Sequence, residues 1–286
     1  MCLSPESSAD AAVILSHRHD NGADFWATPD GRLLKGAPFT TLESAGYLLE
    51  LGVPADDPVL QGTAELVFSH WKPDGRIPTT PGAAAYPCHT ALAANLLCRM
   101  GYAGDVRLQQ TFAYFMASQQ PDGGWKCNKY SFGRGEETRC STPYTTLQVL
   151  DLMRHAPCFG DPRLDRAVDF LLEHWVIRRP ISPCHYGIGT RFLQPEYPFR
   201  GYDLFYYVYV LSFYPSARQD PRFGQAVQAL ADKTVGGQMV VERVVPKLAK
   251  LNFCRKGCPS APATRRWQEI CRNLATRPPG TRLPQI

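Results

Sequence analysis

The sequence predicts an all-α fold, an α/α toroid in which inner and outer helices alternate. Two observations carry this prediction: a helix-pair pattern recurs at least four times, and its two sets of helical segments differ in how apolar they are. With 286 residues, of which 44% are hydrophobic, the chain is long enough to bury one large core.

Four segments each begin with an Asp that is followed three positions later by an apolar residue. They start at Asp57, Asp105, Asp161 and Asp220, at separations of 48, 56 and 59 residues. Such separations fit one two-helix unit per repeat. The Asp suits a helix N-cap, because its carboxylate accepts hydrogen bonds from amides of the first turn that otherwise lack a partner. These helices also carry Gln, Glu, Arg and Lys, as expected for an outer ring.

A second set of helical segments lies between the Asp-capped ones. Its members are apolar or small on nearly every side, which is typical of helices that pack on both faces; they span 39–51, 88–100, 140–153 and 202–214. A helix pair cannot bury its own apolar face, so the units are expected to stack and to close into a barrel. The segment 262–274 predicts one more helix, a closing cap.

We expect one toroid domain over residues 35–275. It is preceded by an N-terminal extension, 1–34, that is expected to be partly ordered at best, and followed by a Pro- and Arg-rich tail, 276–286. The longest apolar run, 204–214, has 11 residues, about half of what a helix needs to cross a bilayer. With no recognisable secretion signal, a cytoplasmic protein with reduced cysteines is expected.

A short motif points to a known family. Residues 119–125, Gln-Gln-Pro-Asp-Gly-Gly-Trp, contain the pattern Q-x-x-x-G-x-W, and residues 72–77 are a degenerate copy. Over roughly residues 35–275 the chain resembles the prenyltransferase and squalene-cyclase-like α/α-toroid repeat family, in particular short bacterial members that are sometimes mislabelled as nitrogen-fixation proteins. The resemblance implies the toroid fold. It implies no settled chemistry, because fold does not dictate function.

Three cysteines predict a zinc site at one mouth of the toroid. Cys88 and Cys140 stand at the starts of inner helices, and Cys127 follows the Gly-Gly-Trp turn, which brings it to the same mouth. Three thiolates supply three of the four tetrahedral ligands that zinc prefers. The resemblance favours His185 as the fourth ligand; Cys184 and Asp203 are the alternatives. The alternative to a metal site is that these cysteines are buried, reduced thiols beside a pocket.

This ligand set differs from the Asp, Cys and His that hold the catalytic zinc of protein prenyltransferases, and it is closer to a closed structural site. Neither the D-x-D-D motif of squalene-type cyclases nor a D-D-x-x-D motif occurs, which argues against a cyclase. Trp125, Tyr202 and Tyr206 are candidates for lining a pocket, or for an aromatic core. His89 and Asp203 are candidates for acid-base roles.

Two functions follow from these features. The first is a metal-dependent enzyme, a transferase of prenyltransferase type, acting on an apolar, isoprenoid-like or other lipid-like substrate. The second is a non-catalytic binding or scaffold protein with a structural metal or a reduced-thiol cluster. The net charge is +5, and ten Lys or Arg stand from Arg243 onward against the single Glu269. This segment is either a solvated tail or a site for an anionic partner, with nucleic acid the less favoured one. The oligomeric state is not predicted.

Overall fold

The structure is a computed structural model that describes residues 3–128 and 139–276. The all-α class is confirmed: the described residues are mainly helical, with one two-stranded antiparallel sheet. The α-helices are α1 (Pro5–Ser16), α2 (Thr41–Leu51), α3 (Pro58–Ser69), α4 (Pro87–Arg99), α5 (Val106–Ser118), α6 (Pro143–Met153), α7 (Pro162–Ile177), α8 (Leu204–Leu211), α9 (Pro215–Arg218), α10 (Pro221–Ala231) and α11 (Ala261–Ala275). Short 3₁₀ helices are η1 (Tyr102–Gly104), η3 (Pro246–Leu248) and η4 (Asn252–Cys254), and the strands are β1 (Thr234–Val235) and β2 (Gln238–Met239).

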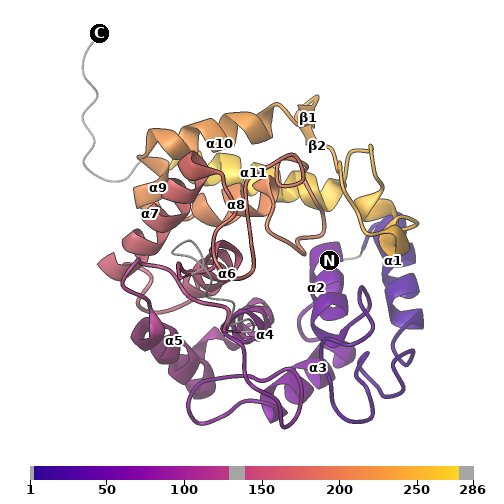
Figure 1. Ribbon diagram of the computed structural model, residues 1–286. Coiled ribbons are helices and arrows are strands. Elements are labelled where there is room, and N and C mark those ends of the chain that lie inside the picture. Colours follow the sequence, from indigo (N-terminus) through magenta and orange to yellow (C-terminus); the bar gives the residue numbers. More distant parts are fainter. Residues whose placement is uncertain (1–2, 129–138, 277–286) are drawn as a thin grey trace.

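The four Asp residues of the repeat are N-caps, as predicted. The carboxylate of each accepts a hydrogen bond from the amide two residues later, at the starts of α3, α5, α7 and α10. The interleaved set forms α2, α4, α6 and α8, which are buried along most of their length. In Figure 1, α3, α5, α7 and α10 lie toward the periphery, and α4 and α6 toward the middle.

Contacts between elements run around the molecule and return to their start. Helix α2 packs on α4, α4 on α6, α6 on α8 and α8 on α11. Helix α11 in turn contacts η4, η4 contacts α1, and α1 contacts α2. The first helix, α1, therefore lies beside the late segment η4 (Figure 1).

The N-terminal segment differs from the expected, at best partly ordered extension. Helix α1 packs against α2 and η4. Ile14 and Trp26 are fully buried, and the Trp26 indole donates a hydrogen bond to the Ile14 carbonyl. The Asp10 carboxylate accepts hydrogen bonds from the backbone amides of Asn252 and Phe253. The partners of Asp10 lie more than 200 positions away, so no local pattern could reveal these contacts.

The Pro-Asp-Gly turns explain why the motif recurs. Gly75 and Gly123 adopt φ of +84° and +90°, and each presses against the backbone of the next outer helix. A Cβ at either position would lie 2.5 Å from a carbonyl oxygen, that of Gln110 in α5 or of Arg166 in α7. Only glycine fits both the dihedral angle and this approach. Each turn therefore packs the end of one Asp-capped helix against the next Asp-capped helix.

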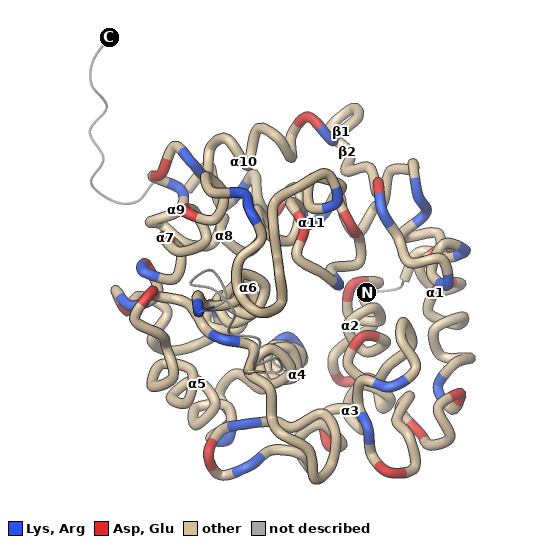
Figure 2. The backbone as a smooth tube through the Cα atoms, in the orientation of Figure 1, with Lys and Arg blue, Asp and Glu red and all other residues tan. Residues whose placement is uncertain are grey.

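Charged residues of both signs are spread along the chain (Figure 2). Many of them are the Asp and Arg of the repeat starts, where Arg107, Arg163 and Arg222 pair with the capping Asp two residues earlier. Such partly exposed pairs contribute at most about 1 kcal/mol each. The stability of the fold therefore comes mainly from its apolar interior.

Candidate functional site

Two of the predicted metal ligands lie together. The Sγ atoms of Cys88 and Cys127 are 3.5 Å apart, well beyond the length of a disulfide bond. Cys88 stands in the first turn of α4, directly after Pro87. Cys127 lies on a segment that is tied to the start of α6, since its amide donates to the Thr142 hydroxyl and the Thr142 amide donates to the Trp125 carbonyl.

Proximity and burial raise the pKa of the Cys88 thiol. The pKa of Cys88 is raised strongly, first by its hydrogen bond with Cys127, then by desolvation and by the charge of Cys127, with a smaller effect of Cys184. A thiolate at this position needs a nearby cation, because the positive end of a helix offsets only part of the desolvation cost. The influence of Cys184 on Cys88 indicates that the Cys184 thiol faces the same region.

The thiol pair lines a cavity of about 530 Å³, a volume typical of small-molecule sites. Its apolar and aromatic walls come from the segment before α2, from α4 and α6, and from the loop before α8. The lining residues are Leu34, Ala37, Glu43, Cys88, His89, Leu92, Cys127, Thr142, Tyr144, Thr145, Gln148, Cys184 and Tyr186.

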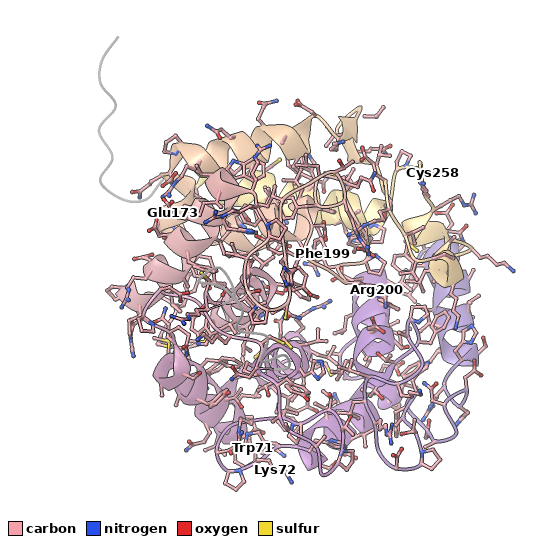
Figure 3. All side chains as sticks on the ribbon, viewed as in Figure 1. Trp71, Lys72, Glu173, Phe199, Arg200 and Cys258 are labelled. Carbon is pink, nitrogen blue, oxygen red and sulfur yellow. The ribbon has the colours of Figure 1, made fainter. Side chains whose placement is uncertain are left out.

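A second cavity, of about 670 Å³, adjoins the first and is more polar. The two share Tyr144, Cys184 and Tyr186 in their walls. The second also receives Arg191, Arg200, Arg243, Glu196 and His185. In the view of Figure 3, Arg200 and Phe199 lie inward of the outer helices, whereas Glu173 and Cys258 lie near the periphery.

The structure does not gather the complete predicted ligand set. Cys184 lines the thiol cavity, whereas its neighbour His185 is exposed and lines only the second cavity of the two. Cys140 is half-buried, two residues before Thr142, the N-cap of α6. Within residues 3–128 and 139–276, no group of three or more His, Cys, Asp or Glu side chains is arranged to hold a metal ion.

Zinc still fits the pair that does meet. Two sulfurs each about 2.3 Å from a tetrahedral zinc are about 3.8 Å apart, close to the observed separation of Cys88 and Cys127. The pair therefore matches one edge of a zinc tetrahedron. Cys184 is a thiol candidate for a further ligand, since it lines both the thiol cavity and a smaller adjoining pocket together with Cys127.

The predicted acid-base candidates have structural partners. His89 lines the thiol cavity, and its Nδ1 lies 2.9 Å from the Thr79 hydroxyl. Asp203 is fully buried as the N-cap of α8, where its Oδ1 accepts from the amides of Phe205 and Tyr206, and it lines neither cavity. Desolvation, followed by the charge of Glu196, raises the pKa of Asp203 to about 8. Asp203 is thus placed to hold α8 and not to touch a ligand in these cavities.

The three aromatic residues that were predicted to line a pocket lie in different places. Tyr202 lines the second cavity, and its hydroxyl lies 2.8 Å from Nδ1 of the buried His174. Tyr206 is buried and donates a hydrogen bond to Asp151. The Trp125 indole donates to the Phe115 carbonyl inside the core. Trp125 and Tyr206 therefore belong to the core and not to the lining of either cavity.

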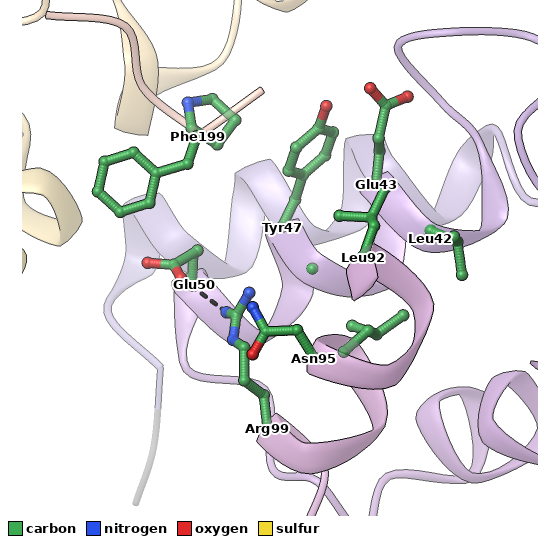
Figure 4. Close-up of a pocket in the computed structure, with 11 residues that line it drawn as sticks. Leu42, Glu43, Tyr47, Glu50, Leu92, Asn95, Arg99 and Phe199 are labelled. Carbon is green, nitrogen blue, oxygen red and sulfur yellow. Dashed lines mark hydrogen bonds and ion pairs between the residues drawn. The ribbon is translucent and has the colours of Figure 1, made fainter. Parts of the chain in front are cut away.

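Sequence reasoning missed a cluster around one buried carboxylate, at the C-terminal ends of α2 and α4 (Figure 4). Glu50 of α2 accepts hydrogen bonds from Arg99 of α4 at 2.6 Å and from Arg266 of α11 at 2.7 Å. The Tyr197 hydroxyl donates to the same carboxylate. A lone Glu in an apolar helix was the only available signal, because its partners come from three distant segments.

No protein-family model matches the sequence, and no curated protein matches it. Among the described residues, no helix is both long and apolar enough to cross a membrane.

Proposed function

We propose that the chain is an α/α toroid that binds an apolar, isoprenoid-like ligand beside a thiolate-held zinc ion and acts on it as a transferase. The circular order of contacts from α2 through α4, α6, α8 and α11 to η4, α1 and back to α2 supports the toroid. The alternation of buried helices with Asp-capped peripheral ones, and the resemblance carried by residues 119–125, support it as well.

The approach of Cys88 to Cys127 at the wall of a cavity is the observation that carries this proposal. The buried thiol of Cys127 and the half-buried thiol of Cys88, 3.5 Å apart, give a soft metal one edge of its coordination polyhedron. Cys184, or Cys140 and His185 as predicted from the sequence, would complete the set. Bound zinc would supply a Lewis acid or an activated nucleophile beside the ligand.

The chain's own residues would bind and shield the ligand. Leu34 and Leu92 offer apolar contact, and the rings of Tyr144 and Tyr186 pack 5.4 Å apart between the two cavities. The Glu43 carboxylate and the Gln148 amide give the same wall polar groups that orient a ligand. Such a mixed lining suits a long apolar molecule with one polar end.

Elemental analysis of protein purified without a nickel column tests the metal. We expect about one zinc per chain in the wild type. Cys88→Ser and Cys127→Ser should lose it, whereas Cys271→Ser, an exposed thiol on α11, should keep it. Cys184→Ser, Cys140→Ser and His185→Ala then identify the other ligands.

A wild-type chain without metal would rule out the zinc proposal. If zinc removal unfolds the chain, as followed by circular dichroism, the metal is structural and the binding or scaffold function is the better account. If the metal-free chain stays folded, solvent extraction and mass spectrometry of the purified protein should identify the apolar ligand. The chemical structure of that ligand then indicates which reaction to assay.

A further inference from the structure

Three arginines from two segments converge on the second cavity. Arg191 and Arg200 belong to the loop between α7 and α8, and Arg243 follows β2. The segments are held together by the backbone, since the Arg243 amide donates to the Pro195 carbonyl at 3.1 Å. All three guanidinium groups lower the pKa of the buried Glu196 against the raising effect of its desolvation, which indicates that they surround this carboxyl group.

Two of these arginines already have carboxylate partners. Arg200 donates to Oε1 of Glu43 through Nε at 2.9 Å and Nη2 at 2.6 Å. Nη2 of Arg243 lies 2.5 Å from Oε2 of Glu196. Within the described part of the chain, Arg191 has no ion-pair partner, and the buried Nε of Arg243 has no hydrogen-bond acceptor. Arg191 therefore leaves donor capacity in the cavity, whereas the enclosed Nε of Arg243 is not itself open to a ligand.

The net charge of the second cavity limits the charge of the ligand that it can bind. Three guanidinium groups against the carboxylates of Glu43 and Glu196 leave one positive charge. Asp203, behind Glu196, has its pKa raised to about 8, so it is largely neutral near pH 7 and does not cancel this charge. A singly charged anion balances the site, whereas a diphosphate would bring excess negative charge next to Glu43 and Glu196.

We propose that the second cavity binds the carboxylate of an amphipathic monocarboxylic acid, through Arg191 and Arg243, with the apolar chain of the acid running past Tyr144 and Tyr186 into the thiol cavity. The planar guanidinium fork matches a carboxylate, which accepts two hydrogen bonds side by side. The two cavities adjoin at both tyrosines and Cys184, so a ligand that extends past these side chains would enter both. This inference rests on the proposed function for the apolar part of the ligand.

Equilibrium dialysis with radiolabelled dodecanoate tests the assignment, with dodecanol and dodecyl phosphate as competitors. We expect dodecanoate to bind the wild type and Arg191→Gln to weaken binding about tenfold, since a charge-assisted hydrogen bond contributes about 1.5 kcal/mol or more. Arg179→Gln is the matched control, an exposed arginine on the same loop that lines neither cavity. Circular dichroism should show all three proteins folded.

Three results would overturn the inference: no binding of dodecanoate, equal competition by dodecanol, or stronger competition by dodecyl phosphate. Zinc content is measured on the same samples, which separates the two proposals. A zinc-bound protein that ignores dodecanoate refutes only the carboxylate site. A zinc-free protein that binds dodecanoate through Arg191 refutes only the metal site.

Discussion

The buried Glu50 cluster joins three helices, and its removal should destabilise the fold. The carboxylate lies between Arg99 and Arg266 and also accepts from Tyr197, while only 9% of its side-chain surface is exposed. Its pKa is lowered from 4.5 to about 2: desolvation, the largest effect, opposes the shift, and the charges of Arg266 and Arg99 overcome it. Linkage converts this difference to about 3 kcal/mol of stability at neutral pH.

The replacement Glu50→Gln leaves the half-buried Arg99 without its carboxylate partner and leaves Arg266 with Glu269 as its only one among the described residues. Removing one partner of a buried pair costs about 3–5 kcal/mol, in agreement with the linkage value. We expect urea unfolding to show a loss of this size at pH 7. Glu65→Gln, at an exposed position of α3, should change stability by no more than about 0.5 kcal/mol.

The pH dependence gives an independent check with a defined sign. Because the folded pKa of Glu50 is lowered, its contribution is complete above the unfolded value of 4.5 and is lost as pH falls toward 2. The difference in stability between wild type and Glu50→Gln should therefore shrink across this window. A difference below about 1 kcal/mol at pH 7, or one that does not change with acid, would refute the reasoning.

Three further predictions concern single residues. The folded pKa of Asp203 is raised, so its ionisation should cost stability as pH rises from about 4 to 8; Asp203→Asn keeps the cap and should remove this slope of about 1 kcal/mol per pH unit in urea titrations. Gly123→Ala should cost more than about 2 kcal/mol because of its contact with the Arg166 carbonyl, whereas Gly82→Ala, also at positive φ but in open space, should cost about 1 kcal/mol; equal losses would count against this packing of the turn. Tyr202→Phe should lower the thermal stability by about 1–3 kcal/mol by leaving His174 Nδ1 without its hydroxyl partner, and an unchanged melting temperature would show that this contact contributes nothing.

Local patterns account for the helices and for much of their ends. The Asp residues at 57, 105, 161 and 220 cap helices because capping depends on amides only two or three positions away. The expected helix at 262–274 became α11, Ala261–Ala275, for the similarly local reason of Ser260 acting as its N-cap. The turn glycines were also readable, because a tight Asp-Gly turn demands positive φ.

Within the candidate site, the sequence by itself determined that Cys88 starts a buried helix and that Cys127 follows a turn. Only the tertiary structure decided that these two thiols lie 3.5 Å apart while His185 faces the other cavity, since neighbouring residues in a loop point in different directions. The Arg191, Arg200 and Arg243 cluster and the Glu50 bridge were likewise decided by the closing of distant segments on one another. Periodicity and caps act over a few residues, whereas charge pairing across a cavity depends on where the whole chain returns.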